Sequence, residues 1–116
     1  MVDWYKACAS IESRIKVNDD INSQWSTLRS ILGKNDNGFV VKVGATSSII
    51  ISYDMLKECF NILLTPQGFS REQFRRIYPR QNVNKPCYFH CIGQIFCRAG
   101  LANIGKSGRR YELIQK

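Results

Sequence analysis

Residues 86–99, Pro-Cys-Tyr-Phe-His-Cys-Ile-Gly-Gln-Ile-Phe-Cys-Arg-Ala, constrain the fold of this chain more than any other stretch. At about 100° per residue, most of the apolar side chains of this stretch fall on one side of a helix and the polar ones on the other. Pro86 suits the first helical position, because an N–H would have no partner there. Gly100 follows the last apolar residue, where a left-handed C-terminal cap is expected. We therefore predict one amphipathic helix over 86–99.

The polar side of this predicted helix carries hydrogen-bonding groups and little charge. It holds Cys87, His90, Gln94 and Arg98, and Arg98 is its only formal charge. An outward helix face of this kind, flanked by basic segments, is typical of a helix that reads DNA. We therefore expect His90, Gln94 and Arg98 to face solvent.

The basic residues are concentrated in the C-terminal part of the chain. Residues 1–66 contain seven basic and seven acidic residues and carry no net charge. Residues 67–116 contain ten basic and two acidic residues, so the whole formal charge of +8 lies there. This asymmetry indicates an anionic partner for the C-terminal part. A basic surface that only keeps the protein soluble is the alternative.

Length and composition predict a single cytoplasmic domain. The chain has 116 residues, of which 44% are hydrophobic and 22% charged, as in ordinary soluble domains. It has no apolar run of the ~20 residues that a membrane span needs, and its N-terminus lacks the features of a signal peptide. Five cysteines cannot all pair, and Cys8 and Cys59 fall at apolar helix positions. We therefore expect a reducing compartment and no membrane partner.

Apolar periodicity predicts two helices at the start of the chain. Residues 3–16 and residues 19–32 each carry an apolar stripe, and Asn18 is placed to cap the second helix. Each helix contains one tryptophan, Trp4 or Trp25, that must be covered. Packing on the rest of the chain would cover them. A homodimer formed through these N-terminal helices is the alternative.

A β-hairpin and a third helix are predicted next. Residues 39–43 and 48–52 are short runs rich in β-branched side chains, separated by a turn that contains Gly44. An isolated hairpin is marginal in water, so this one should pack on helices or join a larger sheet. The third helix is expected from about residue 52 to residue 64, and Pro66 prevents its continuation.

The strongest local signal is the start of a fourth helix. Ser70 and Gln73 have the spacing of a capping box, in which each side chain accepts a hydrogen bond from the backbone N–H of the other residue. Phe69 and Phe74 have the spacing of a hydrophobic staple. These features predict a short helix over 71–78.

The remaining segments are predicted from their turn residues. Residues 79–85 are expected to form a loop that leads to the helix over 86–99. Residues 101–104 and 109–114 have the pattern of two short strands, and the basic, glycine-bounded stretch 105–108 would join them into a second hairpin.

From residue 52 onward, the order of these elements resembles a winged helix-turn-helix domain. The residues that carry the resemblance are 69–74 at the second helix of the motif, 99–101 at the end of the third helix, and 104–113 in the hairpin, or wing. The resemblance is one of architecture and covers residues 52–116.

The resemblance leaves residues 1–51 as an N-terminal extension of two helices and a hairpin. The whole chain, 1–116, is then one α+β domain. One departure from the simplest helix-turn-helix motifs is the length of the stretch 79–85, which is longer than a tight turn.

The resemblance implies that the helix over 86–99 lies in the major groove of DNA, with its N-terminal half nearest the base edges. Gln94 would pair with adenine, Arg98 with guanine, and His90 with a base or a phosphate. Neutralising about six phosphates predicts a log–log slope of affinity against salt of roughly −5. The residues expected at the DNA backbone are Arg71, Arg75, Arg76, Asn84, Lys85, Lys106, Arg109 and Arg110.

Metal and enzyme chemistry have weaker support in the sequence. Cys87, His90 and Cys91 lie one helical turn apart, but a structural zinc site takes four ligands, usually in pairs from two elements. A cysteine–histidine pair on one exposed helix has no pocket and no oxyanion donors. We therefore predict no cofactor, no metal and no enzymatic activity. The expected role is a small transcriptional regulator or a mobile-element accessory protein that binds double-stranded DNA, and a protein-interaction module is the alternative.

Overall fold

Five helices and two small antiparallel sheets make up the described part of the chain, which comprises residues 3–21, 29–43, 47–84, 87–105 and 110–114 of a computed structural model. The α+β class predicted from the sequence is therefore confirmed. The helices are α1 (Trp4–Arg14), α2 (Tyr53–Leu63), α3 (Arg71–Ile77), α4 (Pro79–Asn84) and α5 (Cys87–Arg98). The strands are β1 (Arg29–Asn35), β2 (Gly38–Val43), β3 (Ser47–Ser52), β4 (Phe69–Ser70), β5 (Ala102–Ile104) and β6 (Arg110–Leu113).

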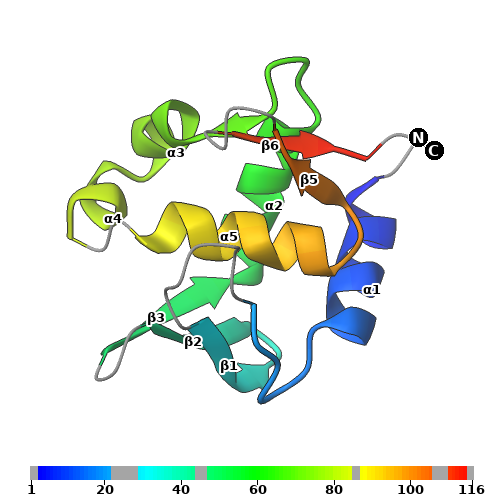
Figure 1. The fold of residues 1–116 in the computed structure, drawn as a ribbon, viewed down its shortest axis with the longest axis vertical. Helices are drawn as coiled ribbons and strands as arrows, with labels where there is room; N and C mark the ends of the chain where they lie inside the picture. Colours follow the sequence, from blue (N-terminus) through cyan, green and yellow to red (C-terminus); the bar gives the residue numbers. More distant parts are fainter. Residues whose placement is uncertain (1–2, 22–28, 44–46, 85–86, 106–109, 115–116) are drawn as a thin grey trace.

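Helix α5 crosses the middle of the molecule, and the other elements surround it (Figure 1). The sheet of β1, β2 and β3 lies on one side of α5, and the strands β5 and β6 lie on the other. Helix α1 packs near the C-terminal end of α5, and α4 lies at its N-terminal end. The buried residues of α5 are Phe89, Cys91, Ile92, Gly93, Ile95 and Phe96. The predicted central helix is thus present, and it is buried on more than one side.

The end of α5 follows the predicted pattern. Gly100 has a φ of +79°, which is the left-handed conformation expected for a residue just past a helix. The N–H of Gly100 donates to the carbonyl of Cys97 at 3.0 Å, and the N–H of Leu101 donates to that of Phe96 at 2.9 Å. These two bonds form a Schellman cap, which satisfies carbonyls that the last turn of the helix leaves without partners.

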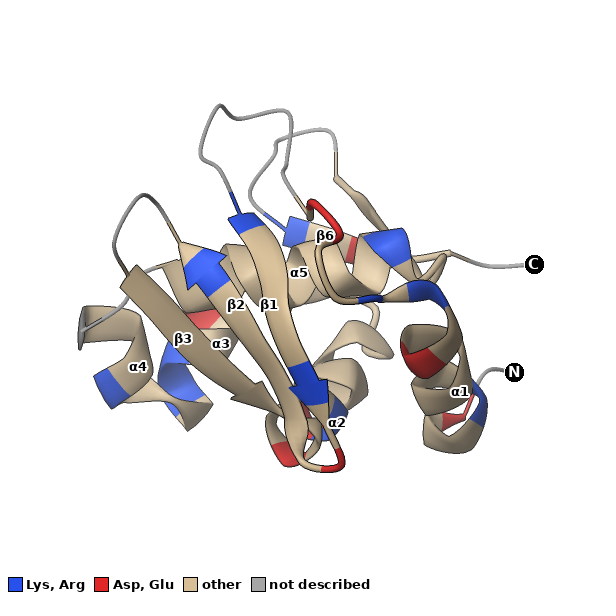
Figure 2. Cartoon of the chain, turned by 90° about the horizontal axis from the view of Figure 1, so that it is seen from below, with Lys and Arg blue, Asp and Glu red and all other residues tan. Residues whose placement is uncertain are grey.

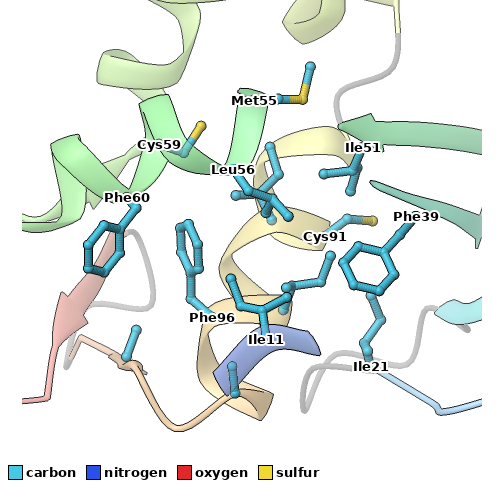
Figure 3. Packing of buried hydrophobic residues seen from close by; sticks show 14 of the residues in the cluster. Ile11, Ile21, Phe39, Ile51, Met55, Leu56, Cys59, Phe60, Cys91 and Phe96 are labelled. Atoms are coloured by element: carbon cyan, nitrogen blue, oxygen red, sulfur yellow. The ribbon is translucent and has the colours of Figure 1, made fainter. Parts of the chain in front are cut away.

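The hydrophobic core combines side chains from both halves of the chain (Figure 3). Ile11 of α1, Phe60 of α2 and Phe96 of α5 meet there. The rings of Trp4 and Phe60 lie 5.8 Å apart, and those of Phe60 and Phe96 lie 6.2 Å apart. Trp4 is therefore partly covered by its own chain, whereas Trp25 lies outside the described residues.

The predicted helix over 19–32 is wrong where the chain is described. Residues 29–35 form β1, which pairs antiparallel with β2 from Arg29↔Val43 to Asn35↔Gly38. The side-chain oxygen of Asn35 accepts from the N–H groups of Asn37 and Gly38 at 2.8 and 3.2 Å, which closes a tight turn between the strands. The two residues of this turn are Asp36 and Asn37, and strand pairing overrides the helical spacing of the apolar residues before it.

Residues 18–21 run beside β1 and do not begin a helix. The N–H of Asn18 donates to the carbonyl of Ile31 at 2.7 Å, and the N–H of Ile31 donates to that of Asp19 at 2.9 Å. Asn18 has a φ of +74°, which turns the chain after α1, so it does not cap a helix as predicted. Residues 22–28 lie outside the described residues.

The first predicted helix, the predicted hairpin and the starts of the next two helices are confirmed. Strands β2 and β3 form the predicted hairpin, and β1 extends it to a three-stranded sheet. Helix α2 begins after Ser52, whose hydroxyl accepts from the N–H of Met55 at 3.1 Å. At the start of α3, the hydroxyl of Ser70 accepts from the N–H of Gln73 at 3.4 Å. The rings of Phe69 and Phe74 lie 6.2 Å apart, as a hydrophobic staple requires.

The predicted loop over 79–85 is also wrong, because Pro79–Asn84 form helix α4. Tyr78 leaves the helical conformation, with φ −128° and ψ 63°, and so ends α3. A residue before proline is sterically driven away from the α conformation. Pro79 is at the same time well suited to begin a helix, and the N–H of Asn82 donates to the carbonyl of Tyr78 at 3.0 Å.

The second sheet joins the C-terminal hairpin to the start of α3. Its strand order is β4-β6-β5, and Tyr111 of β6 lies opposite both Phe69 and Ile104. The predicted C-terminal hairpin is thus confirmed for its strands, while residues 106–109 of its turn lie outside the described residues. In the described ranges, no helix has both the length and the apolar character needed to span a membrane.

Gly93→Ala is predicted to destabilise the fold, because a Cβ at this position would fall on the ring of Tyr111. We expect a loss of about 1–3 kcal/mol in the free energy of unfolding, measured by urea denaturation. Gly33→Ala is the matched control, since its Cβ would meet only Val40, at 3.8 Å. Its effect should stay within about 1 kcal/mol. Equal stability of the two variants would contradict the packing of Tyr111 against α5.

Candidate nucleic-acid interface

Two of the three predicted base-reading residues converge on one tyrosine. The Nδ1 of His90 lies 3.0 Å from the hydroxyl of Tyr111, and the Nε2 of Gln94 donates to the same hydroxyl at 3.1 Å. His90 and Gln94 are one turn apart on α5, and Gly93 between them leaves room for the tyrosine ring. Tyr111 is fully buried, whereas His90 and Gln94 are partly exposed. The polar side of α5 therefore rests partly on β6.

The protonation states of this group follow from its burial. Burial raises the pKa of Tyr111 to about 12, so its hydroxyl keeps its proton at neutral pH. Burial, together with the positive charges of Arg71 and Arg29, lowers the pKa of His90 to about 4. His90 is therefore neutral at pH 7. Of the two groups that contact the hydroxyl of Tyr111, only Nδ1 of His90 can accept its proton, so we assign the proton of the neutral imidazole to Nε2.

The third predicted base-reading residue, Arg98, contacts the N-terminal segment. Its Nε lies 3.3 Å from a carboxylate oxygen of Asp19, and its Nη1 donates to the carbonyl of Asp20 at 3.0 Å. The same carboxylate accepts from the N–H of Lys16 at 2.8 Å. The hydrogen bond from Lys16, followed by the charge of Arg98, holds the pKa of Asp19 below its usual value. Arg98 is exposed, but it has a partner within its own chain.

The predicted backbone-contacting arginines lie mainly on α3 and β6. Arg75 and Arg76 are exposed on α3, where Arg76 pairs with Glu72 at 3.1 Å. Arg110 at the start of β6 pairs with Glu112 at 3.0 Å. Exposed pairs of this kind contribute little stability, so their guanidinium groups can exchange a carboxylate for a phosphate. Lys85, Lys106, Arg109 and the side chain of Asn84 lie outside the described residues.

Arg71 is held more firmly than the other arginines of α3. Its guanidinium carbon lies 5.1 Å from the centre of the Phe89 ring, and its Nη1 donates to the side-chain oxygen of Asn82 at 3.1 Å. A guanidinium stacked on an aromatic ring and hydrogen-bonded to a neighbouring side chain loses little further freedom when it binds an anion. Arg71 is therefore preorganised beside the N-terminal half of α5.

Sequence reasoning missed Arg29. Arg29 lies at the start of β1 and is only 7% exposed. Its positive charge acts to lower the pKa of His90, Cys91 and Tyr111. Figure 2 shows basic residues at the start of β1, near the end of β2 and at the start of β6, all toward one edge of the molecule. The N-terminal part, although neutral in total, therefore contributes positive charge to that edge. No motif pointed to Arg29, because its position was assigned to a helix.

The described cysteines have the properties of packing residues. All five are free thiols, and Cys59 and Cys91 are buried. A hydrogen bond with Cys87, followed by burial, raises the pKa of Cys91, and burial raises that of Cys97 to about 11. A thiol that keeps its proton at neutral pH is a poor nucleophile. In the part of the chain that the structure describes, no three histidine, cysteine or acidic side chains come together as metal ligands.

Stability is predicted to fall between pH 6.5 and pH 4 because of His90, whose pKa is lowered from 6.5 to about 4 by folding. In this window the unfolded chain binds a proton that the folded chain excludes, so acid favours unfolding; above the window the effect vanishes. We expect a loss of about 1 kcal/mol, since solvent reaches part of the ring.

The matched variant for this measurement is His90→Gln, compared with the wild type by urea denaturation at several pH values. Carboxylates that titrate in the same window affect both proteins equally, so the difference between the two pH profiles isolates His90. Parallel profiles between pH 6.5 and pH 4 would contradict the lowered pKa of His90.

Tyr111→Phe is predicted to destabilise the protein by about 1–2 kcal/mol, because His90 and Gln94 would lose their shared partner. Thermal unfolding monitored by circular dichroism measures the effect. Tyr5→Phe is the control, since Tyr5 is 89% exposed and its hydroxyl reaches solvent. The same small change in both variants would show that the hydroxyl of Tyr111 contributes nothing.

The candidate interface thus consists of a neutral polar group at His90, Gln94 and Tyr111, with arginines around it. Comparison with protein-family models, with curated proteins and with solved structures finds no match for this chain.

Proposed function

We propose that this chain binds double-stranded DNA through a winged helix-turn-helix arrangement over residues 52–116. The observation that carries the proposal is the pairing of β4 with β6, which joins the helical part to the C-terminal hairpin in one sheet of order β4-β6-β5. Helix α2, strand β4, helices α3 and α5, and strands β5 and β6 then follow in the order that the resemblance requires. Helix α4 is an additional turn between α3 and α5.

Electrostatics supports contact with the DNA backbone. Arg75 and Arg80 are exposed on α3 and α4, and Arg110 is exposed at the start of the wing strand β6. Neutralising phosphates releases counterions from the DNA and supplies most of the affinity of a basic protein for duplexes of any sequence. The formal charge of +8 in residues 67–116 favours the same partner.

Base reading by His90, Gln94 and Arg98 stays a prediction. Each of these side chains already has a partner within the chain, so contact with a base edge would require exchanging that bond. The geometry therefore favours phosphate contacts as the main source of affinity, with sequence preference as a smaller contribution. A small transcriptional regulator or a mobile-element accessory protein would use such a binding mode.

A salt titration tests the proposal. Fluorescence anisotropy with a random duplex of about 20 base pairs should give an affinity that falls steeply with salt, with a log–log slope of roughly −3 to −5. Arg75→Gln combined with Arg80→Gln should weaken binding to all sequences alike and make the slope less negative by about 1–2. A flat salt response of the wild type would reject DNA binding.

The control for this experiment is Lys6→Gln combined with Lys57→Gln. Both lysines are exposed on α1 and α2, outside the basic half of the chain, and the double variant removes the same charge. It should keep the slope of the wild type. An equal loss in both double variants would mean that only net charge matters, and that α3 and α4 do not form the interface.

Exposed apolar side chains support a second candidate, a protein-interaction module. Ile50 is 67% exposed on β3 and Leu32 is 49% exposed on β1, both in the N-terminal sheet. Exposed apolar side chains mark a protein interface when they form one contiguous patch. This candidate is favoured if DNA binding is absent at all salt concentrations.

A further inference from the structure

We propose that Asp19 makes base reading by Arg98 of α5 selective, because its carboxylate holds the guanidinium unless the duplex offers a guanine at the matching position. The inference rests on the proposed function and extends it from phosphate contacts to sequence preference. Arg98 is then the base-reading residue of α5, and Asp19 is the residue that determines which sequences it contacts.

The first observation is a surface contact between α5 and the segment that precedes β1. Nε of Arg98 lies 3.3 Å from a carboxylate oxygen of Asp19, and Nη1 donates to the backbone carbonyl of Asp20 at 3.0 Å. The side chains of Arg98 and Asp19 are 45% and 22% exposed. DNA can therefore reach the guanidinium without the unfolding of any element.

Asp19 is held in place by bonds that do not involve Arg98. Its carboxylate accepts from the N–H of Lys16 at 2.8 Å, and its backbone carbonyl accepts from the N–H of Ile31 on β1 at 2.9 Å. The N–H of Asn18 donates to the carbonyl of the same isoleucine at 2.7 Å. The carboxylate therefore stays in position when Arg98 leaves, and it continues to compete for the guanidinium.

Arg98 differs from the other two predicted base-reading residues in what its release leaves behind. His90 and Gln94 contact the hydroxyl of Tyr111, which is fully buried. Their release would leave a buried polar group with fewer partners, which is costly. Release of Arg98 leaves the carboxylate of Asp19 in contact with water. Of the three side chains, Arg98 therefore exchanges its partner at the lowest cost.

The relative strengths of the contacts favour a guanine as the new partner. A surface ion pair changes an equilibrium constant by about 1.5- to 5-fold. A bidentate contact of arginine with O6 and N7 of guanine discriminates against a wrong base by about 5- to 150-fold. A single phosphate replaces less than Arg98 loses, because Arg98 gives up both a carboxylate and a carbonyl. Asp19 thus acts against the wrong sequences, which is a general source of specificity.

Two single variants separate the ion pair from the general effect of charge. Asp19→Asn removes the charge that pairs with Arg98, while its amide oxygen can still accept from the N–H of Lys16. Asp20→Asn is the matched control, because it removes the same charge one residue further along. The backbone carbonyl of Asp20, which is the group that contacts Arg98, is unchanged by this substitution.

The first readout is the affinity for DNA of arbitrary sequence, measured by fluorescence anisotropy with a random duplex. We expect Asp19→Asn to raise this affinity by about 2- to 5-fold, because the released guanidinium then contacts phosphates. The gain should be clearly smaller in Asp20→Asn, and it should disappear when Asp19→Asn is combined with Arg98→Gln. An equal gain in both single variants, or a gain that persists without Arg98, would overturn the proposal.

The second readout is sequence preference, measured by sequencing the duplexes that bind from a random library. The wild type should enrich a guanine at one position, and Asp19→Asn should enrich it less. Arg98→Lys should lose the enrichment, because lysine keeps the charge but lacks the planar fork of arginine. This last measurement does not depend on the folding of Asp19→Asn. The same enrichment in Arg98→Lys as in the wild type, or no enriched guanine in the wild type, would overturn the proposal.

These measurements separate the role of Asp19 from the proposed function. A wild type that binds random duplexes with a steep salt response, while the variants at Asp19 and Arg98 show none of the expected differences, would keep DNA binding and reject the role of Asp19. A wild type that binds no duplex at any salt concentration would reject both.

Discussion

The contact between Tyr111 and Gly93 is the one on which the arrangement of the C-terminal half depends. Tyr111 lies on the middle strand of the sheet β4-β6-β5, and its ring stands against α5 where Gly93 has no side chain. Its ring also lies 5.5 Å from that of Phe89 and 6.4 Å from that of Phe69. One buried residue thus holds the hairpin, the central helix and the start of α3 together.

The hydroxyl of Tyr111 is the polar part of this contact, and it holds two side chains of the candidate interface in place. A buried hydroxyl without partners would cost free energy, and His90 and Gln94 satisfy it. The same bonds fix the two side chains that a DNA-reading helix would present to base edges. Structure and base recognition therefore compete for the same groups on α5, whereas the exposed arginines of α3 and β6 have only weak surface partners. This competition is the physical reason for preferring phosphate contacts in the proposed function.

Local signals in the sequence predicted those elements whose ends are decided by neighbouring residues. The cap at Ser70, the staple of Phe69 with Phe74 and the left-handed Gly100 all depend on contacts within about six residues, and all are present. The errors arose where two local readings competed. The apolar spacing of residues 19–32 fits a helix, but pairing of β1 with β2 prevails, and Pro79 begins a helix where a loop was expected.

By itself, the sequence determined the α+β class, the central helix with its cap, the C-terminal hairpin and the concentration of positive charge in residues 67–116. Only the tertiary structure decided which side of α5 remains exposed, because that depends on β6 and the N-terminal sheet, which are distant in the chain. It also decided that Arg29 acts on His90 and that Arg98 contacts Asp19, residues separated by more than sixty positions in each case. Charge and hydrogen bonding act through space, so a pattern along the chain can identify the candidate groups but cannot pair them.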